Sequence, residues 1–60
     1  MIAFIRVTEA ERGKDVFVNP AYVRSVQEIP GGSQITFGDG KTMVVKDPVS
    51  ILVTALQGAR

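Results

Sequence analysis

The chain has 60 residues, a formal net charge of +1 from seven basic and six acidic side chains, and neither cysteine nor histidine. This length allows one domain, and so short a domain buries only about 60% of the surface that its unfolded chain exposes. The composition excludes disulfides and the thiolate and imidazole ligands of zinc, iron and copper sites. We therefore expect stability to come from association, as a homo-oligomer or with an obligate protein partner. The alternative is a monomer whose helix lies deep in a curled sheet.

The charged residues are scattered along the chain and form no run of either sign. A nucleic-acid binder of this size would carry a basic patch and a clearly alkaline balance. No stretch approaches the roughly eighteen apolar residues of a membrane-spanning helix, and Arg6 interrupts the apolar start too early for a signal sequence. We expect a cytoplasmic protein without membrane insertion, for which nucleic acid is an unlikely partner.

Two strands open the chain. Residues 2–7 are rich in β-branched and aromatic side chains, and residues 15–18 resume the pattern after a charged loop that contains Gly13. This spacing predicts a hairpin with a loop longer than the tightest class. Pro20 ends the second strand, because proline has no N–H to donate to a strand partner.

The middle of the chain predicts a short helical turn over residues 20–23, a strand over residues 24–29, and a three-stranded meander. Residues 30–33 form the first turn, residues 34–37 the next strand, and residues 42–46 the returning strand. The pair Asp39-Gly40 marks the second turn, because glycine tolerates the positive φ of a tight hairpin. Three phenylalanines at strand positions are expected in the core, and the single tyrosine is expected to be partly buried: Phe4, Phe17, Phe37 and Tyr22.

A helix closes the chain. Asp47 suits the position that caps its first amides, Pro48 suits its first turn, and Gly58 suits its end. At about 100° per residue the apolar side chains cover an arc of roughly 200°, which is wider than the stripe of about 100° that a surface helix needs. We therefore predict that a helix face forms an interface, through Val49, Ile51, Leu52, Val53 and Leu56.

These elements define an α+β fold that is mostly β. We expect one small domain over residues 1–60, built on a strongly twisted antiparallel sheet. A hairpin is followed by the three-stranded meander, the sheet curls toward half a barrel, and a single C-terminal helix packs on it.

The residues for catalysis are missing. Without histidine or cysteine the common pairs of nucleophile and base cannot form, and Asp39 and Asp47 already have structural roles in a turn and at a helix cap. The glycine-rich segments 30–33 and 38–41 each join strand to strand, whereas a phosphate-binding loop joins a strand to a helix. We predict that the protein is not an enzyme and needs no metal or cofactor.

The order and spacing of these features resemble a known family. The shared frame consists of Met1-Ile2, Phe17-Val18-Asn19-Pro20, Val23, Val26, Glu28, Pro30, Ile35-Thr36-Phe37, Gly40-Lys41, Val44-Val45-Lys46 and the closing helix. It resembles the FlbD-type small flagellar proteins over most of the chain. The resemblance implies a part in flagellar assembly or motility, and a relative in swarming bacteria is linked to motor power. It implies no catalytic residues, and it makes Asn19, Pro20, Gly40 and Val44 structural positions.

Two classes of function remain open. The first, which we favour, is a non-catalytic module that assists flagellar assembly or motility through protein–protein contacts of its apolar helix face and its sheet edge. The second is a small oligomeric nucleic-acid-binding regulator, because the meander and helix also resemble the final half of LytTR-type domains. An oligomer would then gather basic residues of several copies into one surface: Arg6, Arg24, Lys41 and Lys46.

Overall fold

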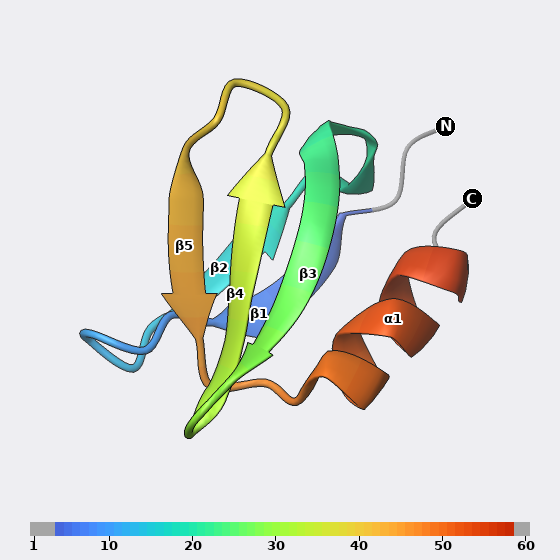
Figure 1. Ribbon diagram of the computed structural model, residues 1–60. Coiled ribbons are helices and arrows are strands. Elements are labelled where there is room, and N and C mark those ends of the chain that lie inside the picture. The colour runs from blue at the N-terminus through green and yellow to red at the C-terminus, as the bar shows by residue number, and fades with distance from the viewer. Residues whose placement is uncertain (1–3, 59–60) are drawn as a thin grey trace.

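The computed structural model describes residues 4–58 (Figure 1). In chain order the elements are β1 (Ile5–Thr8), β2 (Asp15–Val18), the 3-10 turn η1 (Pro20–Tyr22), β3 (Val23–Ile29), β4 (Gly32–Phe37), β5 (Thr42–Val45) and α1 (Val49–Gly58). This order confirms the predicted hairpin, meander and single C-terminal helix. The predicted start of the first strand at residues 2–3 lies outside the described residues.

The strands form two antiparallel sheets, β1-β2 and β3-β4-β5. One corner joins them, where the chain leaving β1 runs along β5: Lys46 N–H donates to the Thr8 carbonyl at 2.8 Å, and Ala10 N–H donates to the Val44 carbonyl at 3.0 Å. In Figure 1 the hairpin lies behind the meander, and α1 lies beside the lower end of β3. The strands of residues 4–58 make two open sheets rather than a closed barrel.

The core lies between the two sheets and the helix. Strand side chains alternate between faces, so Ile5 and Val7 of β1 point inward together and meet Val18 and Val16 across the hairpin. Because α1 packs against both β3 and β1, it covers the gap between the sheets. The buried apolar residues are Ile5, Val7, Val18, Ile35, Val45 and Leu52.

Tight local geometry supports the predicted turns. Asn19 Oδ1 accepts a hydrogen bond from Ala21 N–H at 3.0 Å, which starts η1 with Pro20 at its first position. Gly40 has a φ of 88°, as the turn between β4 and β5 requires. Asp39 Oδ1 accepts the Lys41 N–H at 3.0 Å in the same turn.

The predicted capping role of Asp47 is wrong. Its Oδ1 accepts the Thr8 N–H at 2.7 Å, and α1 begins two residues later at Val49, with Leu52 N–H bonded to the Pro48 carbonyl at 3.1 Å. The amide of Thr8 points away from β2 and is half-buried, so it needs an acceptor that β2 cannot supply. The Asp47 carbonyl in turn accepts the hydroxyl of the fully buried Ser33 at 2.6 Å. Asp47 therefore fastens the β5–α1 connection to β1 and β4.

Replacing Asp47 should weaken the fold more than replacing an exposed turn aspartate. Asp47→Ala leaves the half-buried Thr8 amide without its acceptor, so the free energy of unfolding should fall by about 1–3 kcal/mol. Asp39→Ala removes one comparable bond from an exposed turn and should cost less than about 1 kcal/mol. Urea denaturation of both variants measures the difference. Equal losses would mean that the Thr8–Asp47 bond does not connect these elements.

The predictions for three aromatic side chains are also wrong. Phe4, Phe17 and Tyr22 are 59%, 65% and 67% exposed, whereas Phe37 is half-buried against the core as expected. The register explains Phe17: it pairs with Arg6, and it therefore lies on the face of the hairpin opposite Val16 and Val18. Aliphatic side chains of both sheets already fill the inner face.

Candidate functional site

Several large apolar side chains stay exposed after the core is filled. They are Phe4, Phe17, Tyr22, Val44, Ile51 and Val53. Single exposed apolar residues are normal on protein surfaces, but neighbouring ones mark sites of contact. We consider two such pairs: Ile51 and Val53 on α1, and Phe17 of β2 with Phe4, which precedes β1.

The first pair flanks the buried stripe of α1. Leu52 is 1% exposed, whereas Ile51 and Val53 are 57% and 39% exposed. In a helix the neighbours of a residue point about 100° to either side of it. Ile51 and Val53 thus form two apolar shoulders, which we call the helix shoulders, on either side of the face that docks on the sheets.

The structure divides the five residues predicted as an interface. Leu52 lies in the core of the single chain, Val49 and Leu56 are half-buried, and Ile51 and Val53 are exposed. The chain's own sheets thus cover the centre of the wide apolar arc and leave its margins open. A role for these margins as an interface stays a prediction.

The second pair lies on the outer face of the hairpin. Phe17 of β2 is opposite Arg6 of β1, and Phe4 precedes β1 by one residue. Arg6 Nη1 lies 3.9 Å from Asp15 Oδ2, and both side chains are largely exposed, so this ion pair adds little stability. The sequence did not indicate this surface, because three apolar residues in a row in β2 are equally consistent with a strand buried on both faces.

The four basic residues considered for nucleic acid are all exposed, and only Arg24 and Lys41 lie at the same end of one sheet, on either side of β4. Lys41 and Lys46 flank opposite ends of β5, and Arg24 lies in β3. Arg6 belongs to the other sheet and faces Asp15. A single copy therefore presents separate positive charges rather than a stripe that could follow a phosphate backbone.

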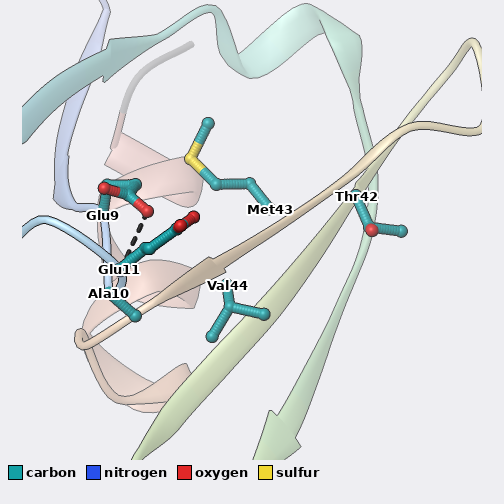
Figure 2. Close-up of a pocket in the computed structure, with 6 residues that line it drawn as sticks. All are labelled: Glu9, Ala10, Glu11, Thr42, Met43 and Val44. Atoms are coloured by element: carbon teal, nitrogen blue, oxygen red, sulfur yellow. Dashed lines mark hydrogen bonds between the residues drawn. The ribbon is translucent and has the colours of Figure 1, made fainter.

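The surface has several hollows, and in two of them a carboxylate holds a local turn. One is lined by Glu9, Ala10, Glu11, Thr42, Met43 and Val44 (Figure 2). There the Glu9 carboxylate accepts the amides of Glu11 and Arg12, both at 2.9 Å. A second hollow is lined by Tyr22, Phe37, Gly38 and Asp39, where Asp39 holds the β4–β5 turn. Residues 4–58 contain no group of three or more acidic, histidine or cysteine side chains that could hold a metal ion.

None of the helices within residues 4–58 combines the length and the apolar character needed to cross a membrane. The longest is α1, with 10 residues, whereas a bilayer needs about 20.

Fold and surface together define a small, mostly β protein that exposes apolar side chains on its helix and on its hairpin. The protein belongs to the FlbD family of flagellar and swarming motility proteins, whose model matches residues 1–60, the whole chain. This match confirms the resemblance found in the sequence and indicates a role related to flagella or motility. No curated protein and no solved structure matches the chain.

Proposed function

We propose that the protein is a cytoplasmic, non-catalytic interaction module that supports flagellar assembly or swarming motility by binding a protein partner through the helix shoulders. The family supports the cellular process. The observation that supports the mode of action is the exposure of Ile51 and Val53, which remain open although Leu52 between them is buried.

Energetics favour this surface as a docking site. Burying one fully exposed aliphatic side chain contributes about 1.5–3 kcal/mol. Ile51 and Val53 are 57% and 39% exposed, so a partner that covers both gains about as much as it would from one such side chain. A micromolar affinity corresponds to about 8 kcal/mol, so the partner must make further contacts. The helix is held by Leu52 in the core, and its shoulders are therefore presented in a fixed orientation with little ordering cost. A partner with an apolar groove or a second amphipathic helix fits such a surface.

A complementation experiment tests the proposal. In a strain of the source organism that lacks the gene, the double variant Ile51→Gln, Val53→Gln should fail to restore swarming. Glutamine is a good helix former, and because both sites are exposed the free energy of unfolding should change by less than about 1 kcal/mol. Swarm diameter measures function, and circular dichroism of the purified chain measures folding.

The matched control places the same residue at two exposed positions outside the helix. Thr42→Gln, Val44→Gln changes exposed sites of β5 and should restore swarming fully. The proposal fails if the folded shoulder variant swarms as well as the unaltered protein.

A further inference from the structure

β2 has a partner strand on one side only. It pairs with β1, and nothing in residues 4–58 pairs with its other edge. In an antiparallel hairpin, opposite residues alternate between pairs that exchange hydrogen bonds and pairs that do not. Glu9 N–H donates to the Lys14 carbonyl at 2.8 Å, and counting from this pair makes Thr8↔Asp15 and Arg6↔Phe17 the non-bonded pairs. The amides and carbonyls of Asp15 and Phe17 therefore point away from β1, to the open edge.

Bonds on the far side of β1 agree with this count. Thr8, opposite Asp15, directs its carbonyl to Lys46 N–H at 2.8 Å and its amide to Asp47 Oδ1 at 2.7 Å, both away from β2. Hydrogen bonds on both sides of β1 thus agree on which backbone amides and carbonyls of the hairpin point outward.

The β2 edge is short and carries Asp15, but it lacks three other features that protect exposed edges from pairing. Such edges usually carry lysine, proline or a bulge. The four residues of β2 include neither lysine nor proline, and their register with β1 is regular. By contrast, the outer strand β3 has a register shift between Val23 and Ser25, and α1 packs against it. Of the outer strands β2 and β3, β2 is therefore the better suited to pair with another strand.

We infer that two copies of the chain pair through β2, antiparallel, around a two-fold axis at Val16. Asp15 then lies opposite Phe17 of the second copy, and Phe17 opposite its Asp15, so the open amides and carbonyls of both strands bond to each other. The two hairpins become one continuous sheet in the order β1-β2-β2-β1. This inference does not depend on the proposed function, because α1 packs on β1 and β3 and presents a separate surface.

A second copy is the occupant because the edge is complementary to itself. In this register Val16 meets Val16 of the second copy on the face that continues the core, and the two Phe17 rings lie diagonally on the outer face, within reach of each other. Asp15 keeps its own Arg6 at 3.9 Å, so no unpaired charge enters the interface. Such self-complementarity is what a two-fold interface requires, and association suits a short chain without disulfides.

The mass of the purified chain in solution tests the inference. Sedimentation at micromolar concentrations should show a dimer. Phe17→Glu places a carboxylate directly opposite Asp15 of the second copy at both symmetry-related positions, and this repulsion should raise the dimer dissociation constant by about one to two orders of magnitude. Tyr22→Glu introduces the same charge at an equally exposed aromatic outside β2 and should leave the dimer unchanged.

Disulfide trapping tests the register and does not require Phe17→Glu to fold. The chain has no cysteine of its own, so Val16→Cys introduces a single thiol. Non-hydrogen-bonded pairs bring Cα atoms to about 4.5 Å, which a disulfide can span, and mild oxidation should yield a covalent dimer. Val44→Cys, at an exposed site of β5, should not. A chain that stays monomeric, or a dimer that Val16→Cys does not trap, overturns the inference and leaves the proposed function standing.

Discussion

Leu52→Asp should unfold the chain under conditions in which the unaltered protein is folded. Leu52 is 1% exposed and belongs to the helix that spans the gap between β1 and β3. Truncating a buried leucine costs about 2–5 kcal/mol, and a buried carboxylate without a partner adds to that loss. Domains have only about 5–15 kcal/mol of stability, and short ones lie at the lower end. Circular dichroism should show loss of the native spectrum and of a cooperative thermal transition.

Neighbouring positions on the same helix provide the control. Ile51→Asp and Val53→Asp introduce the same charge one residue away, at exposed sites, and should leave the chain folded. Leu52→Ala should give a folded but weakened protein, which allows the loss to be measured by urea denaturation. A Leu52→Asp variant that is as stable as Ile51→Asp would show that α1 does not dock through Leu52.

Local signals were enough to predict the elements. The Asn19-Pro20 pair predicted the end of β2 and the short turn after it, and Asn19 Oδ1 does accept the Ala21 amide. Asp39-Gly40 predicted the tight turn in which Gly40 takes a positive φ. Both turns depend only on residues a few positions apart, so a short stretch of sequence is enough to predict them.

Contacts between distant residues explain the errors. Asp47 has the usual chemistry of a helix cap, yet it bonds to Thr8, 39 positions away, because the fold brings a half-buried amide to it. Phe17 is apolar like its neighbours, and only its register with Arg6 assigns it to the outer face. No pattern within either segment distinguishes these outcomes.

The candidate surfaces were predictable to different degrees. The wide apolar arc of the helix predicted that some of it would remain uncovered, but which part depends on how α1 docks on the sheets. Docking through Leu52 leaves Ile51 and Val53 exposed on either side. The open β2 edge depends on strand order: β5 runs beside the chain that leaves β1, and β2 is left outside. Strand order of this kind is not encoded in any single strand.

Gly32 was predicted as part of a turn, and the structure gives it a different role. It is the first residue of β4 and has an ordinary φ, unlike Gly31 before it, whose φ is 84°. Next to it lies the end of β5, where Ser33 pairs with Val45 and both are fully buried. The backbone of Val45 approaches Gly32 so closely that glycine is needed for its lack of a side chain, not for a turn conformation.

Gly32→Ala should therefore destabilise the protein by about 3 kcal/mol, at the upper end of the usual costs of overpacking. A Cβ there would overlap the Val45 carbonyl oxygen and lie 3.0 Å from Lys46 Cα, and these backbone atoms cannot rotate aside. The strands must separate where the Ser33 hydroxyl bonds to the Asp47 carbonyl, so the connection to α1 loosens with them. Gly38→Ala, in the same sheet's other turn, meets its nearest neighbour at an ordinary 3.8 Å and should change the free energy of unfolding by less than about 1 kcal/mol. If urea denaturation gives both variants the same stability, β4 and β5 are not in this close contact at Gly32.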